Sequence, residues 1–386
     1  MRGSVPVDFN PCMKHQLIRK TVREFAENEI KSMVAELDRD ARFPHEIVER
    51  MKPLHFFGLQ VPKRLGGAQL DTVSYAIVIE ELSRVSAALG LCVTVHNSVG
   101  IYPILEFGTR EQINRFVPAM AAGESIGAFC LTEANAGSDA GGVETSARQM
   151  DDGYIINGTK IFVTNGGVAG TILVFAVTEG QKSAANVFII EKERPGFFVG
   201  EIEDLCGMRA NPVSSLFFED CKVPRENLLG KPGQGLKIGL TGLDTGRLGI
   251  AAQALGIAQA AFEESVSYAK ERQQFNKPIS LFQTIQNYLA DMATNIDAAR
   301  LLLHRAAAYK DKGTPFSAQA SMAKLFCSDT ARKVTDMAVQ IHGGYGYSKE
   351  YDVERYFRDA KVTQIYEGTS EVQQMVIARH ILTQPS

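Results

Sequence analysis

The chain has 386 residues, of which 45% are hydrophobic and 22% are charged. These fractions are close to those of ordinary folded proteins, which argues against long disordered regions, and the length suits two or three domains. The formal net charge of −3 leaves no basic excess to neutralise a phosphate backbone, so we expect no nucleic-acid partner.

The six cysteines are scattered and form no CxxC pair, so the sequence predicts reduced thiols and no metal site. This usage favours the bacterial cytoplasm, or the mitochondrial matrix for a chain whose transit peptide has been removed. The most apolar stretch, near Ala87 to Val95, is shorter than the roughly 20 residues that cross a bilayer, and we expect no membrane span.

Helical spacing dominates the first third of the chain, where Ile18, Val22 and Phe25 recur at four and three residues. It predicts an all-α N-terminal domain over residues 1–124. Short β-branched runs separated by turns such as Asn157-Gly158 follow, and they predict a middle β domain over residues 125–235. No segment of helical length separates these runs, which favours an antiparallel barrel or sandwich.

Helices return after Gly235 and continue to the end of the chain. An apolar seam with alternating spacings of four and three runs from Ile285 to Leu303, and it is typical of a helix that packs in a bundle. We therefore predict a C-terminal four-helix-bundle domain over residues 236–386. The predicted fold class is multidomain α+β.

Several common nucleotide and catalytic motifs are missing from the sequence. It contains no GxxxxGK[ST] loop, no GxGxxG that follows a strand and opens a helix, and no HExxH motif, and no Ser-His-Asp order stands out. This disfavours Rossmann dehydrogenases, P-loop enzymes, hydrolases and metalloenzymes.

Three polar, glycine-bearing clusters lie at the junctions between periodic segments: residues 129–139, 340–347 and 365–371. Each has an ordinary explanation, as a turn-rich loop, a helix C-cap and a helix start respectively. Each could also approach a ligand closely. A catalytic role for Glu367 requires an apolar pocket that raises its pKa toward neutrality, so that it can work as a general base.

Taken together, these clusters resemble the acyl-CoA dehydrogenase family along essentially the whole chain, in particular its short-chain and short-branched-chain members. The matching segments are TEANAGSDA at 132–140, TKIFVTN at 159–165, LDTGRLGIAAQALGIAQ at 243–259, ERQQFNKPI at 271–279, QIHGGYGY at 340–347 and RDAKVTQIYEGTSEVQ at 358–373. The resemblance implies three domains, with FAD between the middle domain and the C-terminal bundle.

The resemblance also implies which residues hold the ligands. Along the flavin ring it places Phe129, Leu131, Thr132, Gly137, Ser138, Phe162 and Thr164. Contacts to FAD from a neighbouring subunit would come from Arg272, Phe275, Gln283, Gln340, Gly343 and Gly344, and contacts to its ADP half from Thr369 and Glu371. The acyl-CoA substrate would be held by Ser138, Asp244, Arg247, Tyr366 and Gly368.

In such enzymes the base removes the α-proton, flavin N5 takes the β-hydride, and the product is a trans-2-enoyl-CoA. The resemblance makes Glu367 the base; some relatives place it directly before the arginine that aligns with Arg247, where this chain has Gly246. It further implies a homotetramer that passes electrons to an electron-transfer flavoprotein.

The acyl group stays open at this stage, among butyryl, 2-methylbutyryl, isobutyryl and cyclic groups. So does the direction of the reaction, because an enoyl-CoA reductase or an acyl-CoA oxidase could use the same fold. A non-catalytic protein that binds acyl-CoA or FAD is a third alternative, which the intact Glu367 cluster disfavours.

Overall fold

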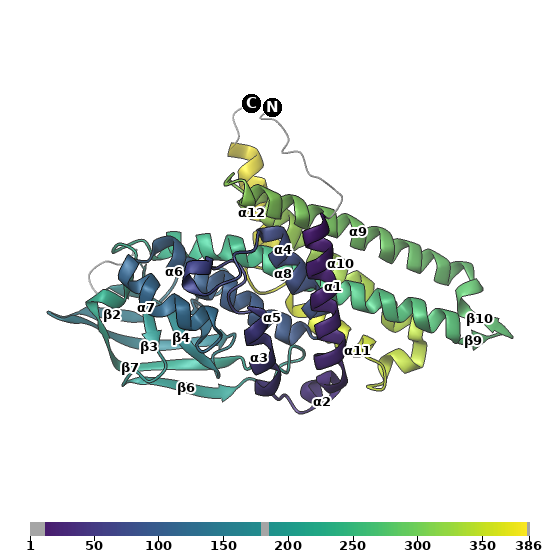
Figure 1. Cartoon of the computed structure of the whole chain (residues 1–386), viewed down its shortest axis with the longest axis horizontal. Coiled ribbons are helices and arrows are strands. Elements are labelled where there is room, and N and C mark those ends of the chain that lie inside the picture. The colour runs from purple at the N-terminus through teal and green to yellow at the C-terminus, as the bar shows by residue number, and fades with distance from the viewer. Residues whose placement is uncertain (1–11, 179–184, 384–386) are drawn as a thin grey trace.

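The computed structural model describes residues 12–178 and 185–383. Residues 1–11 of the predicted N-terminal domain therefore lie outside the described residues. A β-sheet domain occupies one end of the molecule, and two long helices reach away from it at the other end (Figure 1). The remaining helices lie between these two parts, so the expected order of helical, β and helical regions is present.

The N-terminal region is helical, and three of its described α-helices begin at a residue whose side chain caps them. The side chain of Asp71 accepts a hydrogen bond from Ser74 N at 2.7 Å, and Thr109 forms a capping box with Gln112. The α-helices of this region are α1 (Met13–Phe25), α2 (Val34–Arg39), α3 (His45–Met51), α4 (Thr72–Val85), α5 (Ala87–Val95), α6 (Tyr102–Phe107) and α7 (Arg110–Ala121).

The stretch from α5 to α6, Ala87–Phe107, is the one helical run in the described chain that is long and apolar enough to cross a membrane. In the folded molecule 89% of its most apolar window is buried. Helix α5 packs on α4 and on the long helix α8 (Gly235–Glu271), which accounts for its apolar composition.

The middle domain is a mixed sheet with the strand order β6-β7-β3-β2-β4-β5-β8, and β1 pairs beside β4. Most pairings are antiparallel, as expected, but β1 and β2 both run parallel to β4 because the chain crosses the sheet before forming β4. The strands are β1 (Ile126–Cys130), β2 (Ser146–Gln149), β3 (Gly153–Val163), β4 (Ala169–Thr178), β5 (Ala185–Glu191), β6 (Phe197–Ile202), β7 (Ser214–Pro224) and β8 (Leu228–Leu229).

The C-terminal region consists of long helices and one short hairpin. Helices α9 and α10 run side by side, and the hairpin lies at their far end (Figure 1). With α8, the elements are β9 (Gln273–Gln274), β10 (Lys277–Pro278), α9 (Gln283–Asp311), α10 (Ser317–His342), α11 (Val353–Val362) and α12 (Ser370–Thr383).

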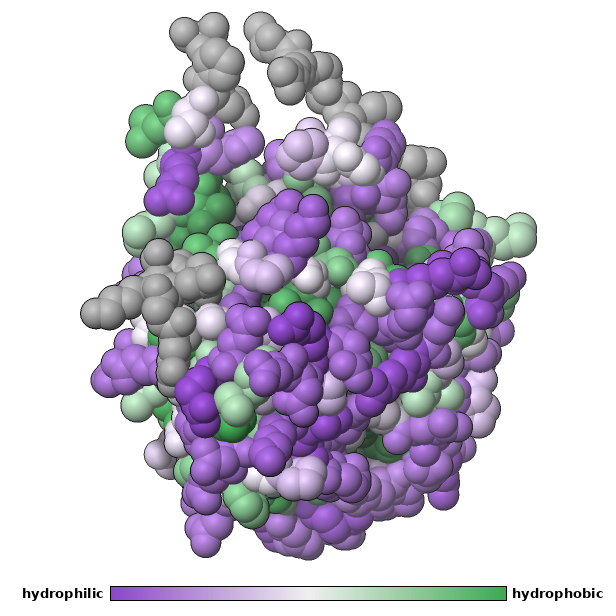
Figure 2. Space-filling model, turned by 90° about the vertical axis from the view of Figure 1, so that its left-hand side faces the viewer, coloured by the Kyte–Doolittle hydropathy of each residue, from purple (hydrophilic) through white to green (hydrophobic). Residues whose placement is uncertain are grey.

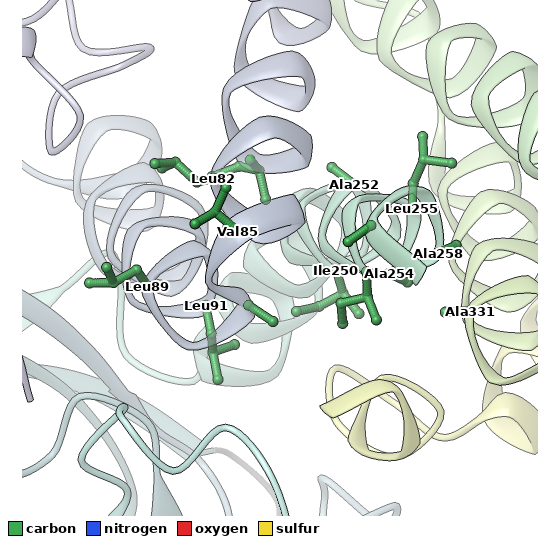
Figure 3. Close-up of a cluster of buried hydrophobic side chains, with 14 of the residues drawn as sticks. Leu82, Val85, Leu89, Leu91, Ile250, Ala252, Ala254, Leu255, Ala258 and Ala331 are labelled. Atoms are coloured by element: carbon green, nitrogen blue, oxygen red, sulfur yellow. The ribbon is translucent and has the colours of Figure 1, made fainter. Parts of the chain in front are cut away.

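Helix α8 is the central element of the fold, since it packs against α4 and α5 on one side and α9 and α10 on the other. Leucine and valine side chains of α4 and α5 meet the isoleucine, leucine and alanine side chains of α8 in the largest core cluster (Figure 3). Glycines recur along α8 at spacings of mostly four and three: Gly235, Gly239, Gly242, Gly246, Gly249 and Gly256. This α8 glycine row lets neighbouring groups approach the helix backbone.

The outer face of the β domain is mostly hydrophilic, with isolated apolar residues (Figure 2). Many apolar side chains of its strands form an internal cluster that includes Ile156, Val174 and Phe188, which are fully buried, whereas Phe198 on β6 and Phe217 on β7 are among the exposed ones. This side of the molecule is therefore built to face water.

Candidate functional site

A cavity of about 550 Å³ lies where the middle domain meets the C-terminal helices. Its wall combines the start of the loop after β1, the end of β3 and the segment that leads into α12. Nine of the predicted ligand-binding and catalytic residues line it: Thr132, Gly137, Ser138, Phe162, Thr164, Tyr366, Glu367, Gly368 and Thr369. Segments more than 200 residues apart in the sequence thus meet at one cavity.

Glu367 lies in a tight turn just before α12. Its φ of 54° and that of Gly368, 90°, are both left-handed, a conformation that is unfavourable for glutamate. The residue is half-buried, but its carboxylate oxygen Oε2 is buried and has no hydrogen-bond partner among the described residues. Burial raises the pKa of Glu367 to about 7, against the opposing charges of Arg247 and Lys324.

The backbone N–H of Glu367 also has no acceptor within the described chain. The turn itself is held by side chains of three helices. Gln373 Nε2 donates to Glu367 O at 3.2 Å and to Gly368 O at 2.8 Å, Lys324 Nζ donates to Gly368 O at 2.8 Å, and Arg247 Nε donates to Glu367 O at 3.5 Å. Thr369 Oγ1 accepts from Val372 N and so caps α12, as the sequence predicts.

Gly246 lies directly beneath the carboxylate of Glu367. A Cβ at this position would be 2.4 Å from Glu367 Oε2, which is far inside van der Waals contact. The two positions that the sequence resemblance offers for a base therefore lie next to each other in space. Glycine at 246 leaves room for the Glu367 carboxylate.

One side of the cavity is closed by a chain of hydrogen bonds between α8 and α5. The Tyr366 hydroxyl donates to Gln253 Oε1 at 2.5 Å, and Gln253 Nε2 donates to Ala87 O at 2.8 Å. Gln253 is fully buried, and the cavity wall next to Tyr366 includes Leu91 and Met208. The wall near Glu367 is thus largely apolar.

The loop after β1 is fixed from below by a buried ion pair. Lys160 Nζ donates to Glu133 Oε1 at 2.6 Å and to Leu131 O at 3.3 Å, and Glu133 also accepts backbone hydrogen bonds from Glu144 and Thr145. These contacts fix the backbone on both sides of Thr132. The hydroxyl of Thr132 is therefore presented at the cavity from a rigid loop.

A second cavity, of about 670 Å³, lies at the end of α10 and the start of the hairpin. Arg272, Gly343 and Gly344 line it, together with Tyr268 and His342. His342 is buried because its ring stacks on Tyr268, with the centroids 4.1 Å apart, and its Nδ1 donates to Ala338 O. None of these residues lines the cavity around Glu367.

Three family models match consecutive parts of the chain: acyl-CoA dehydrogenase, N-terminal domain at residues 13–124, middle domain at 128–221 and C-terminal domain at 233–382. The chain belongs to the acyl-CoA dehydrogenase family. The resemblance inferred from the sequence motifs is confirmed, as is the three-part fold. The protein is an FAD-dependent oxidoreductase that dehydrogenates acyl-CoA thioesters.

Full-length relatives support this assignment. A short-chain specific acyl-CoA dehydrogenase of Clostridium acetobutylicum is 48% identical over 97% of this chain and 100% of its own length. An acryloyl-CoA reductase (NADH) of Anaerotignum propionicum is 43% identical over 97% of this chain and 96% of its own length. The solved structure of butyryl-CoA dehydrogenase from Megasphaera elsdenii has a TM-score of 0.95 at 44% identity, covering 97% of this chain and 100% of that one.

The cavity of the dehydrogenase fits a flavin. The hydroxyls of Thr132, Ser138 and Thr164 give it hydrogen-bonding groups along one wall, and the ring of Phe162, which is 57% exposed, offers an apolar face. Thr369 stands just before the N-terminus of the 14-residue helix α12, where the helix dipole favours a phosphate. The residues present thus suit the ring and the charged part of FAD.

Five residues predicted to bind the cofactor or substrate lie away from this cavity. Phe129 packs its ring on Phe175 at 4.8 Å, and Leu131 lines a smaller cavity beside α8. Asp244 accepts hydrogen bonds from Arg247 and from Ser317 Oγ. Arg247 in turn contacts the Glu367 turn, while Glu371 is exposed in the first turn of α12.

The other predicted contacts lie in the region of the second cavity. Phe275 is 88% exposed at the tip of the hairpin, where its ring approaches Phe282. Gln283 and Gln340 are exposed on α9 and α10. Because these three side chains are exposed in a single chain, they can contact another molecule.

The sequence motifs did not point to Lys324, Gln253 or Gln373. All three are fully buried, and all three contact the Glu367 turn or Tyr366. A signal for two of them was available, because Lys324 and Gln253 are polar residues inside otherwise apolar helical stripes. Charged or amide groups at such positions need a specific partner.

Proposed function

We propose that Glu367 is the general base that removes the α-proton of the acyl-CoA. The observation that carries this proposal is the buried, partnerless Oε2 at a cavity that also presents the flavin-binding hydroxyls. A pKa of about 7 leaves a substantial fraction of the carboxylate ionised at neutral pH while keeping it basic enough to accept a proton from carbon.

The unpaired N–H of Glu367 is the proposed hydrogen-bond donor to the thioester carbonyl. A donor at that position stabilises the negative charge that develops on the carbonyl oxygen as the α-proton leaves. Because the N–H and the carboxylate belong to one residue, the turn that holds Glu367 sets the positions of both groups. Bound FAD supplies the acceptor for the β-hydride, and the product is the trans-2-enoyl-CoA.

Replacing Glu367 by glutamine tests the assignment. The side-chain amide cannot accept the proton, so E367Q should bind FAD and acyl-CoA normally yet reduce its flavin at least ~10²-fold more slowly than the wild type. Anaerobic stopped-flow absorbance measures the rate directly. The melting temperature at pH 8 should not fall, because the substitution removes a buried carboxylate that burial disfavours.

Near-normal flavin reduction by E367Q would refute the role of Glu367 as base. A colourless wild-type protein that takes up no flavin would contradict the enzyme assignment itself.

We infer that the substrate is a short acyl-CoA, with a butyryl group as the best fit among the candidates. The support is the hydrogen-bonded pair of Tyr366 and Gln253, which fills the space between α8 and α5 behind the cavity. The short-chain relative agrees with this size. Asp244 and Arg247, which pair beside the Glu367 turn, are the proposed contacts to the CoA part. Ser138 and Tyr366 are proposed to line the thioester end, and Gly368 is a further proposed substrate contact.

Truncating Gln253 should lengthen the preferred acyl chain. In Q253A the space of the amide becomes available, so the ratio of kcat/KM for hexanoyl-CoA to that for butyryl-CoA should rise roughly tenfold. A panel of straight and branched acyl-CoAs measures this ratio. An unchanged ratio in a folded, FAD-loaded variant would show that another residue limits the chain length.

A homotetramer is the proposed assembly, because Arg272, Phe275, Gln283, Gln340, Gly343 and Gly344 gather far from the Glu367 cavity and suit the FAD of a neighbouring subunit. Sedimentation of the FAD-loaded protein as a monomer would contradict it.

An electron-transfer flavoprotein is the proposed acceptor, and the exposed ring of Phe162 offers it an approach to the flavin. The proposed location is the cytoplasm, or the mitochondrial matrix, which agrees with six free cysteines.

The reductive direction is a second candidate, favoured by the acryloyl-CoA reductase relative. The two directions are separated by incubating the enzyme with butyryl-CoA and with crotonyl-CoA plus NADH. Enoyl-CoA reduction that outpaces acyl-CoA oxidation would favour the reductase.

A further inference from the structure

Lys324 is a buried charged residue that the proposed reaction leaves without a function. It lies on α10, its side chain is fully buried, and no carboxylate of the described chain is within 4 Å of its ammonium group. The only acceptor that it contacts among the described residues is Gly368 O, at 2.8 Å. Burying an ammonium group with a single carbonyl acceptor costs free energy. A functional role for the charge would explain why the fold keeps it.

The bonded carbonyl belongs to the residue next to Glu367. Since Glu367 and Gly368 both have left-handed φ values, the turn needs external contacts to persist. Lys324 on α10 and Gln373 on α12 supply them at the same carbonyl oxygen, and Arg247 on α8 adds a longer contact to Glu367 O. Loss of one contact would let the turn, and with it the carboxylate, move within the cavity.

The charges around this turn come from each helix packed against it. Arg247 on α8 and Lys324 on α10 are the cations that lower the pKa of Glu367 against its burial. Lys324 itself faces the charges of Glu367, Arg247, Asp329 and Glu371, and burial lowers its pKa to about 8. It therefore carries a positive charge at neutral pH while Glu367 titrates.

We propose that Lys324 is a positioning residue that acts through the Glu367–Gly368 turn: it holds the carboxylate of Glu367 in the catalytic cavity and supplies a positive charge that favours its ionised form. This inference rests on the proposed role of Glu367 as base. It assigns two separable effects to one side chain, a geometric one through Gly368 O and an electrostatic one through the ammonium charge.

Three variants separate the two effects. K324M removes both the charge and the hydrogen bond, K324Q removes the charge but keeps a donor near Gly368 O, and Q373L removes hydrogen bonds to the turn without changing any charge. K333M is the matched control, because Lys333 lies on the same helix but its side chain is 43% exposed, in an ion pair with Asp291. FAD content and near-UV circular dichroism establish that each variant is folded.

The first readout is the pH dependence of flavin reduction by butyryl-CoA. K324M and K324Q should shift the acid limb to higher pH by about 1 unit, since a neighbouring cation no longer favours the carboxylate. K324M and Q373L should also lower the plateau rate at least about tenfold, because the base is less well aligned. K333M should match the wild type in both respects.

The second readout does not depend on turnover. The infrared band of the protonated Glu367 carboxylic acid, assigned by its loss in E367Q, should titrate at higher pH in K324M and K324Q than in the wild type. An unshifted limb and an unshifted band in both lysine variants would overturn the electrostatic half of the proposal. A wild-type plateau rate in folded K324M would overturn the geometric half. Where the lysine variants do not fold, a wild-type plateau rate in Q373L would overturn it, because the turn would then keep its position after losing one of its two contacts to Gly368 O.

The experiment also separates this inference from the proposed function. Rapid flavin reduction by E367Q would refute the base itself. If E367Q reduces its flavin slowly, but the pH profile and the infrared band are unshifted in K324M and K324Q, only the electrostatic role of Lys324 is refuted.

Discussion

At the scale of single residues, the carboxylate of Glu367 has an environment that suits a base. It is buried, it lacks a partner among the described residues, and two cations on separate helices partly offset the effect of burial. The same carboxylate in an exposed helix start would titrate near its ordinary value and would be a much weaker base at neutral pH.

The rate of flavin reduction should therefore depend on pH near neutrality. The base works only when it is deprotonated, and the pKa of Glu367 is about 7, so kcat/KM should rise with pH through that value and level off above it. Stopped-flow measurements from pH 5.5 to 8.5 follow this limb. A flat profile over the range would mean that the free enzyme contains no titrating base with this pKa.

The motifs pointed to Glu367, to eight other residues of its cavity and to Arg247, but not to Lys324 and Gln373, the other two side chains that hold the turn. Glu367 was found because its neighbours form a recurrent sequence segment. Lys324 and Gln373 were missed because each acts on a backbone carbonyl, and contacts to carbonyls leave no pairwise pattern in the sequence. Gln253 was missed because its partner, Tyr366, is 113 residues away.

At the scale of elements, helix α8 links Glu367, the proposed base, to the rest of the fold. Its Gly246 lies beneath the Glu367 carboxylate, and a Cβ at Gly249 would lie 1.7 Å from Thr94 Oγ1. The periodic seams predicted the long C-terminal helices well. They could not predict that β1 and β2 run parallel to β4, because a strand's direction relative to its neighbour depends on distant pairings.

Alanine at position 246 should impair catalysis without unfolding the enzyme. The new methyl group would lie 2.4 Å from Glu367 Oε2, so the carboxylate must move, whereas replacing glycine inside a helix gains up to about 1 kcal/mol of helix propensity. We expect flavin reduction to slow at least about tenfold in G246A.

The control is G242A on the same helix, where the nearest atom, Pro103 Cγ, is 3.3 Å away. Its gain in helix propensity is the same, but it does not touch Glu367. Equal rates in the two variants would indicate that the space beneath Glu367 is not critical.

At the scale of the whole molecule, a buried charge network joins helices that are far apart in the sequence. Glu80 on α4 accepts hydrogen bonds from Arg19 on α1 at 2.8 Å and from Arg300 on α9 at 2.9 Å. Burial opposes ionisation of Glu80, but the two guanidinium groups outweigh it and lower its pKa to about 2. The N-terminal helices are thereby tied to the C-terminal bundle.

Removing this charge should destabilise the fold, and the effect should depend on pH. In E80Q Arg19 keeps its ion pair with Glu81, but Arg300 loses its carboxylate partner, which costs about 1.5 to 3 kcal/mol, so E80Q should melt a few degrees below the wild type at pH 7. Since the folded pKa lies below the ordinary 4.5, the stabilisation is present above pH 4.5 and is lost as the pH falls toward 2. The difference in melting temperature should therefore narrow over that range.

The exposed Glu24, which pairs with Lys20, provides the matched control, and E24Q should melt like the wild type. If the difference in melting temperature between E80Q and the wild type stays constant down to pH 3, the charge of Glu80 is not what stabilises the folded protein.

The α8 glycine row also limits how the length of this protein can change. A single-residue insertion or deletion within α8 turns everything beyond it by about 100° around the helix axis and shifts it by about 1.5 Å. Gly235 lies against the sheet, Gly256 lies against α4, and Gly246 leaves space beneath Glu367. After such a change, one helix could no longer place all three glycines correctly. We therefore expect natural length variation to fall in surface loops, and α8 to keep a constant number of residues.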